Sequence, residues 1–188
     1  MSISPNKAET HRVCITVGGE KVLYNRPTAT QFTSLITTKN LLNSMVSTIL
    51  ALFMCAEIHD FYCNTPMVDF EYMKLPLSMS PQEIIDQYNL KDLLSTDCYV
   101  YMEIRKGIPG INQAGRLASD RLTKNLVRNG YAPVPHTLSL WRHHPSDLMF
   151  SLVIDDFGIK YTRKADADKL QESLWGDYEI TEDWKGEK

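Results

Sequence analysis

The chain lacks the excess of basic residues that a self-sufficient nucleic-acid-binding protein usually carries. Its 188 residues include 20 Lys and Arg against 23 Asp and Glu, which gives a net charge of −3. Overall electrostatics would not hold such a protein on a polyanion, so any such binding must use locally placed cations. The candidate phosphate contacts are Lys39, Arg105, Lys106, Arg116, Arg121 and Lys124. Each is equally consistent with an ordinary solvated surface charge.

The sequence also lacks the patterns of disulfide, zinc and membrane proteins. Its four cysteines are scattered without a C-x-x-C pair, which excludes a recognisable zinc site or disulfide framework and indicates reduced thiols. Residues 1–10 are polar and show no secretory signal. The longest apolar stretch, around 49–58, is too short to span a bilayer. We therefore expect a soluble intracellular protein with no membrane contact.

What the chain does have is ordinary globular composition. Hydrophobic residues make up 43% and charged residues 23% of the chain, which excludes wholesale disorder. The length suits one domain. We expect residues 1–10 to form a flexible N-terminus and residues 11–188 to form the domain.

Hydrophobic periodicity and turn signals predict a mixed order of elements. Gly18-Gly19 between two β-rich runs predicts a hairpin, and apolar residues at helical spacing predict a helix over 30–50. Ser80 is the expected N-cap of a helix over 80–90. Further helices are expected over 113–128 and 165–175, and strands over 51–67, 70–77, 98–104, 138–144, 148–156, 157–162 and 178–184. Sequential hairpins of this kind indicate an α+β fold with an antiparallel sheet.

Two of the expected strands carry acids inside apolar runs. Glu57 and Asp60 belong to the first, and Asp155-Asp156 form the expected tip of a hairpin. If these strands are neighbours, the like charges raise one another's pKa values and cost stability unless a cation compensates them. Two Mg²⁺ ions about 3.5–4 Å apart between such carboxylates form the phosphoryl-transfer site of polymerases and nucleases. The alternative is that the Asp pair serves only as turn chemistry.

Three segments that contain these acids resemble one known family. "AEIHDFYCNTPM", "YVYMEIRKGIPGINQAGRLASDRL" and "FSLVIDDFGIKY" resemble, in the same order, motifs A, B and C of copia-like retrotransposon reverse transcriptases, over roughly residues 12–184. The resemblance implies a reverse-transcriptase palm with part of the fingers. It also implies a fragment of a Gag-Pol type polyprotein that stops before the thumb and RNase H domains.

The resemblance further implies an RNA-directed DNA polymerase that adds dNTPs to a primer 3′ end. Its partners would be an RNA or DNA template-primer and other polyprotein domains such as RNase H and integrase, and its cofactors two Mg²⁺ or Mn²⁺ ions. Its location would be the nucleus or a cytoplasmic virus-like particle. The implied catalytic and metal-binding residues are Glu57, Asp155 and Asp156. The implied nucleotide-binding residues are Phe61, Tyr62, Lys106, Gly107, Gly110 and Gln113.

Two of these implied roles have structural alternatives. Tyr62 falls at the position of the aromatic ring that excludes a ribose 2′-hydroxyl, but it is equally consistent with a core aromatic. The glycines of the motif B turn would let the backbone approach template and nucleotide closely. A tight strand-to-helix connection explains them as well.

The sequence departs from the family pattern at the motif A acid. Glu57 stands where the family has Asp, and the extra methylene moves the carboxylate by about 1.5 Å. Active sites commonly lose orders of magnitude in rate to a misplacement of about 1 Å. Pro109 replaces an aromatic residue in the motif B turn and removes a backbone donor there. The alternative function is therefore a catalytically silent remnant that serves only as a folded or nucleic-acid-binding module.

A third interpretation is an RNA-binding α+β domain that stacks bases on sheet aromatics. Tyr99 and Tyr101, two residues apart in an expected strand, share a face. The recognition motif of that family is absent, which disfavours this interpretation.

Overall fold

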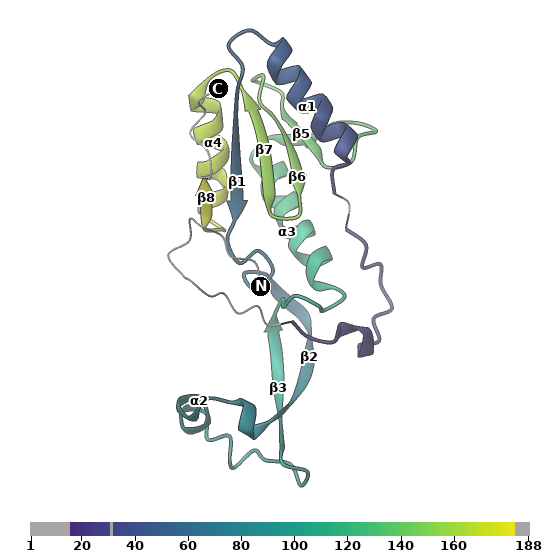
Figure 1. Ribbon diagram of the computed structural model, residues 1–188, viewed down its shortest axis with the longest axis vertical. Helices are drawn as coiled ribbons and strands as arrows, with labels where there is room; N and C mark the ends of the chain where they lie inside the picture. Colours follow the sequence, from purple (N-terminus) through teal and green to yellow (C-terminus); the bar gives the residue numbers. More distant parts are fainter. Residues whose placement is uncertain (1–15, 31, 183–188) are drawn as a thin grey trace.

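A six-stranded antiparallel sheet organises the computed structural model, which describes residues 16–30 and 32–182 (Figure 1). The strand order is β4-β5-β6-β7-β1-β8, so the chain's first strand lies between two late ones. These strands are β1 (Leu52–Ile58), β4 (Tyr131–Pro133), β5 (Leu140–His143), β6 (Met149–Val153), β7 (Asp156–Tyr161) and β8 (Ile180–Glu182). The predicted α+β class with an antiparallel sheet is confirmed.

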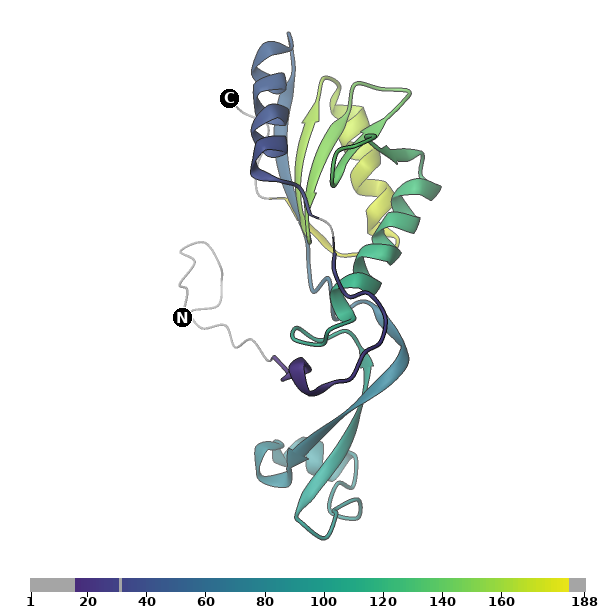
Figure 2. The same ribbon diagram turned by 90° about the vertical axis from the view of Figure 1, so that its right-hand side faces the viewer.

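One face of the sheet packs against α3 (Ala114–Arg128) and α4 (Lys164–Trp175), which Figure 2 shows on the side opposite to α1 (Leu35–Ser47). Alternate residues of the two central strands point into this core because strand side chains alternate between faces. The buried set includes Met54, Ala56 and Ile58 of β1 and Phe157, Ile159 and Tyr161 of β7. The helix predicted over 113–128 is confirmed as α3, and its residues Ala114, Ala118, Leu122 and Leu126, spaced four apart, are all buried.

The opposite face of the sheet carries a buried lysine. Lys160 points away from the main core, and its Nζ donates to Ser44 Oγ at 2.6 Å and Thr48 Oγ1 at 2.8 Å. Ser44 belongs to α1, which lies over this face (Figure 2), and Thr48 is the C-cap residue of the same helix. A buried ammonium needs such acceptors, so the side of α1 that faces the sheet is polar.

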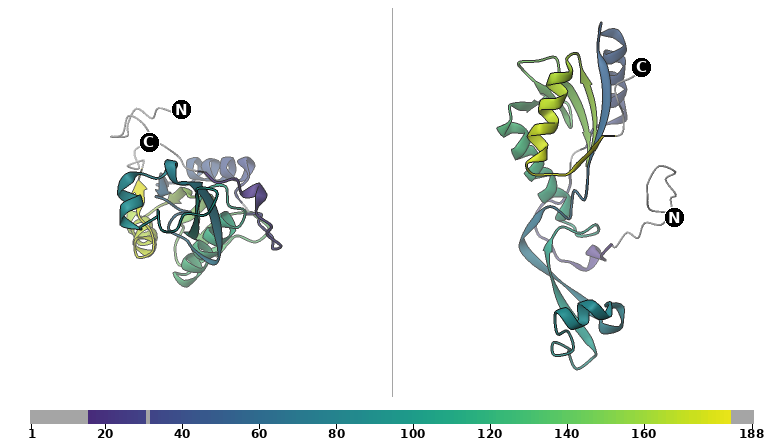
Figure 3. Two further views of the ribbon diagram at one scale, coloured as in Figure 1. Left: turned by 90° about the horizontal axis from the view of Figure 1, so that it is seen from below. Right: turned by 90° about the vertical axis from the view of Figure 1, so that its left-hand side faces the viewer.

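A two-stranded arm projects from the end of the sheet domain (Figures 1 and 3). It consists of β2 (Pro66–Pro76) and β3 (Tyr99–Lys106), which pair in antiparallel fashion. Between them run η2 (Leu77–Met79) and α2 (Gln82–Gln87). A small separate cluster of Ile85, Leu90 and Val100 is buried here, so the arm has a core of its own.

Two local predictions were wrong. Residues 16–24 contain no strand; Gly18-Gly19 lead instead into a 3₁₀ turn, η1 (Gly19–Lys21). Ser80 does not cap α2, because Pro81 occupies the N-cap and no side chain caps this end. Proline is suited to that place since its fixed φ, here −57°, agrees with an extended cap residue and it has no N–H to satisfy.

Most of the remaining predicted elements are present within the described residues, but the expected strand over 51–67 ends at Ile58 and a turn follows it. The tip of the β6–β7 hairpin lies one residue earlier than predicted, at Ile154-Asp155, because Asp156 already pairs with Val153. The expected flexible segment 1–10 and the end of the expected domain, 183–188, lie outside the described residues. No helix in the described part of the chain is both long and apolar enough to cross a membrane.

The buried lysine gives a stability prediction. Replacing Ser44 by Ala and Thr48 by Val removes both acceptors of Lys160 while leaving the ammonium buried, so the free energy of unfolding should fall by about 2–4 kcal/mol. Adding Lys160→Met should recover most of the loss, because a fully apolar cluster leaves no polar group without a partner. Urea denaturation of the three proteins tests this. A triple variant no more stable than the double variant would contradict it.

Candidate active site

The pairing of β1 with β7 brings together acids that are far apart in the chain. Glu57 lies directly opposite Asp156 in the antiparallel register, so the two side chains share one face of the sheet. Asp155 precedes Asp156 in the β6–β7 turn, and its carbonyl accepts a hydrogen bond of 3.0 Å from the Ile58 N–H. Three predicted site residues therefore meet at one end of the sheet.

The paired acids line a pocket on the face covered by α1. Side chains alternate along β1, so Phe53, Cys55 and Glu57 lie on the face opposite to the main core. The pocket encloses about 390 Å³ and is closed on one side by Thr38 and Leu42 of α1. A solute in this pocket would reach the carboxylates of Glu57 and Asp156.

The charges of this site are poorly compensated. Burial raises the pKa of Asp155 above its ordinary value, and the negative charge of Glu57 raises it further. None of the ion pairs of the described residues includes Glu57 or Asp155. Neither carboxylate therefore forms an ion pair with a basic side chain in that part of the protein.

The turn that holds Asp155 is strained. Ile154 has φ +61°, a conformation that is rare for a β-branched residue. Tight hairpin turns normally place Gly, Asn or Asp at such positions. Strain of this kind costs about 1–3 kcal/mol and clusters at functional sites. Sequence reasoning missed Ile154, although an isoleucine in a two-residue turn was the available signal.

The two predicted aromatic site residues differ in their exposure to solvent. Tyr62 lies near the acids: burial raises the pKa of its hydroxyl, and the charge of Asp155 adds to the increase. Phe61 is instead buried in the main core, with its ring 6.3 Å from that of Tyr178. A nucleotide could reach Tyr62 but not Phe61 in this arrangement.

The glycines of the motif B turn contact the protein's own backbone. The Gly107 N–H donates to Thr65 O at 2.9 Å, and a Cβ on Gly107 would lie 2.7 Å from the Tyr62 carbonyl oxygen. Gly110 has φ +99°, and the backbone of Val17 occupies the space beside it. The glycines were expected to let a nucleotide approach the backbone of this turn. In the structure, the backbone of two other segments of the chain packs closely against them instead.

The two remaining nucleotide-binding candidates differ in accessibility. Lys106 is exposed at the end of β3. Gln113 is only 1% exposed, and its Nε2 donates to Glu71 Oε1 at 2.7 Å, which ties the start of α3 to β2. The Gln113 Oε1 has no partner among the described residues. Gln113 therefore acts here as a bridge between α3 and β2.

A magnesium ion at these carboxylates would need further ligands from its substrate and from water. Among residues 16–30 and 32–182, no three His, Cys, Asp or Glu side chains are grouped closely enough to hold a metal by themselves. Mg²⁺ is usually held by only one or two carboxylates together with substrate phosphates and water. Any one or two of Glu57, Asp155 and Asp156 could serve in this way. Asp60 lies outside the cluster, with its Oδ2 3.1 Å from His59 Nδ1.

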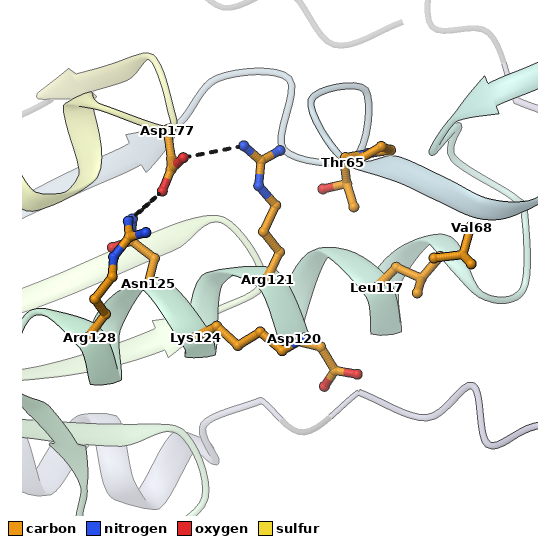
Figure 4. Close-up of a pocket in the computed structure, with 10 residues that line it drawn as sticks. Thr65, Val68, Leu117, Asp120, Arg121, Lys124, Asn125, Arg128 and Asp177 are labelled. Carbon is orange, nitrogen blue, oxygen red and sulfur yellow. Dashed lines mark hydrogen bonds and ion pairs between the residues drawn. The ribbon is translucent and has the colours of Figure 1, made fainter.

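Three of the six candidate phosphate contacts are already paired with carboxylates. Arg105 contacts Glu103 and Arg116 contacts Asp120. Arg121 lies in an open pocket of about 470 Å³ beside α3, where its guanidinium is 3.6 Å from Asp177 (Figure 4). The positive charges of these three arginines are therefore partly neutralised by carboxylates of the protein itself.

The Asp177 carboxylate links α3 to the loop before β8. It accepts hydrogen bonds from Asn125 at 2.6 Å and Arg128 at 3.0 Å (Figure 4). These hydrogen bonds and the neighbouring arginines lower the pKa of Asp177. The cluster is best explained as a structural staple.

Tyr99 and Tyr101 share one face of the arm, as the spacing predicts. The Lys74 Nζ lies 4.2 Å from the centre of the Tyr99 ring and 5.9 Å from that of Tyr101. Lys74 is also paired with Asp97 at 2.5 Å. The charge of this aromatic face is therefore balanced.

Comparisons with known proteins add no relative. The sequence matches no family model, and no curated protein or solved structure is significantly similar to it.

A pair of glycine substitutions tests the packing of the motif B turn. Gly107→Ala places a methyl group against the Tyr62 carbonyl and should lower the free energy of unfolding by about 2 kcal/mol. Gly115 lies within α3, and a methyl group on it would meet only ordinary contacts at 3.6 Å. Gly115→Ala should therefore raise the free energy of unfolding by about 0.5 kcal/mol. Denaturant titrations measure both. Equal stability of the two variants would contradict the described contact.

The crowded acids predict a change of stability with pH. Because the folded-state pKa of Asp155 is raised, its ionisation costs stability as pH rises through the interval between the unfolded and folded pKa values, and the loss persists above it. When a chelator removes divalent cations from the buffer, Glu57→Gln should therefore increase the free energy of unfolding at pH 7. The gain should vanish at pH values where the carboxyls are protonated.

The matched control is Glu172→Gln, which removes an exposed carboxylate from α4. It should leave the stability at pH 7 nearly unchanged. If Glu57→Gln gains no more than this control, the two acids do not repel one another as described.

Proposed function

We propose that this chain is the core of a metal-dependent nucleotidyltransferase, an RNA-directed DNA polymerase of the retrotransposon type. The observation that carries the proposal is the register of β1 and β7, which sets Glu57 opposite Asp156 beside the strained turn of Asp155. In this interpretation the sheet with α3 and α4 is the palm, and the arm of β2 and β3 is part of the fingers.

Glu57, Asp155 and Asp156 would hold the divalent ions, Mg²⁺ or Mn²⁺. Bound ions of this kind neutralise the phosphates of a nucleotide and lower the pKa of an attacking hydroxyl. The carboxylates would position the reacting groups, and Glu57 and Asp155, which form no ion pair among the described residues, would be available for this role. The substrates would be dNTPs and the 3′ end of a primer on an RNA or DNA template.

The Tyr62 ring would lie beneath the sugar of the incoming nucleotide. Its proximity to Asp155 supports this, because the charge of Asp155 contributes to the raised pKa of the Tyr62 hydroxyl. A flat ring there leaves no space for a ribose 2′-hydroxyl. Other polyprotein domains, RNase H and integrase, would be the protein partners, in the nucleus or in a cytoplasmic virus-like particle.

The second candidate function is a catalytically silent module of the same origin. The longer side chain of Glu57 favours it, as does the burial of Phe61 and Gln113, which leaves fewer groups for a nucleotide. Such a module would keep the fold and lose either ion binding or turnover.

Metal-dependent nucleotide binding and primer extension distinguish the two. We expect calorimetry to detect dNTP binding that requires Mg²⁺ and is lost in Asp155→Asn. Extension of a primer on an RNA template should rise at least about 10-fold in Glu57→Asp, because the shorter carboxylate corrects a misplacement of about 1 Å. The matched control is Asp60→Asn, which removes a nearby acid outside the cluster and should change neither signal.

Two outcomes would decide against polymerase activity. Binding without extension in Glu57→Asp, with Mg²⁺ or Mn²⁺, would favour the silent module. A folded protein whose thermal midpoint and calorimetric signal do not respond to Mg²⁺ and dNTP together would reject the metal site itself.

A further inference from the structure

Three basic side chains line the open pocket of about 470 Å³ beside α3 (Figure 4). Arg121, Lys124 and Arg128 follow one another at intervals of three and four residues, so one face of α3 presents all of them. The start of β2 and the loop that carries Asp177 form the rest of the pocket. Because α3 packs on the face of the sheet opposite to the acids, this pocket is separate from the candidate active site.

The pocket has a surplus of positive charge, although the chain as a whole carries −3. Its two carboxylates are those of Asp120 and Asp177. Asp120 lies 2.9 Å from Arg116, which is outside the pocket and neutralises it. Three positive charges then stand against the single negative charge of Asp177. The pocket therefore favours an anionic ligand.

Asp177 occupies only part of the basic groups around it. It accepts a hydrogen bond of 3.0 Å from one terminal nitrogen of Arg128, whereas a guanidinium has five N–H donors. Lys124 is exposed and forms no ion pair with any residue in the described part of the chain. An anion that enters the pocket would thus meet an unpaired ammonium and a guanidinium that Asp177 already holds in place.

The other end of the pocket is apolar. Figure 4 shows Val68 and Leu117 at that end, away from Arg128 and Asp177. Val68 is 78% exposed, so its side chain is available for contact. Leu117 and Lys124 are seven residues apart on α3, which corresponds to about 10 Å along the helix. A ligand that fits both ends is therefore an anion with an apolar body of about this length.

We propose that this pocket binds a small phosphate monoester with a flat apolar body, the chemistry of a nucleoside monophosphate. Its phosphate would lie between Lys124 and Arg128, because ammonium and guanidinium groups are common partners of phosphate. A phosphate monoester carries a charge of about −2 at pH 7, which matches the surplus of the pocket. The base would pack on Val68 and Leu117. The volume of the pocket lies within the range of about 300–1,000 Å³ that small-molecule sites occupy.

Calorimetric titration with AMP in a buffer with EDTA tests the site. The chelator excludes metal-dependent binding at the acids, so the result is independent of the proposed polymerase function. The unmodified chain should bind AMP with a dissociation constant below about 1 mM. Lys124→Met should raise that constant at least about 10-fold, because it removes one of two charged phosphate contacts. Circular dichroism checks that each variant folds.

The matched control is Lys91→Met, which removes an exposed lysine from the segment between α2 and β3. It should leave the dissociation constant of AMP within about twofold, since a distant exposed charge contributes little. No binding of AMP to the unmodified chain would overturn the proposal. Equal weakening by Lys91→Met and Lys124→Met would overturn it as well.

Three further ligands test the chemistry of the two ends. Ribose 5-phosphate lacks the base and adenosine lacks the phosphate, so each should bind at least about fivefold more weakly than AMP. A ten-nucleotide RNA without terminal phosphates offers only singly charged phosphodiesters and should also bind more weakly. Equal affinity for AMP and ribose 5-phosphate would overturn the role of the apolar end. Tighter binding of the RNA that is lost in Lys124→Met would overturn the assignment to a small ligand.

Discussion

The register between β1 and β7 is the constraint on which the candidate site depends. A shift of one residue would turn Glu57 into the apolar core and Ala56 toward the pocket, because side chains alternate along a strand. The core therefore fixes the site: Met54, Ala56 and Ile58 can be buried only in the register that sets Glu57 opposite Asp156. Packing on one face of the sheet thereby determines chemistry on the other.

This arrangement stores unfavourable energy that the core offsets. Burial and the charge of Glu57 disfavour the ionised form of Asp155, and Ile154 adds backbone strain in the same turn. A fold selected only for stability would have little use for either feature. Both would be expected where a cation and a phosphate must be held, because their binding relieves the repulsion between the carboxylates. The same two features thus make this end of the sheet costly in folding energy, and they support the proposed cation site.

Local patterns predicted most elements, since helical spacing, alternation and turn signals act over a few residues. Helix α3 and the hairpin of β6 and β7 were confirmed for this reason, although the tip of the hairpin lies at Ile154-Asp155, one residue earlier than predicted. Phe61 and Gln113 lay beyond such reasoning. Phe61 is adjacent to the exposed loop but turns into the core, and Gln113 is buried only because β2 supplies Glu71 as its partner. Burial of these two depends on contacts between distant segments, and one sequence does not specify those contacts.

Helix α1 shows how one buried charge can reorganise a surface. Leu35, Leu42 and Val46 form an apolar seam along α1 that would ordinarily lie against the sheet. Lys160 prevents this because its buried ammonium requires hydroxyl acceptors, and Ser44 and Thr48 lie on the opposite side of the helix from the seam. Once those hydroxyls face the sheet, Leu35 and Val46 are left exposed. The lysine on one strand therefore determines which side of α1 is exposed.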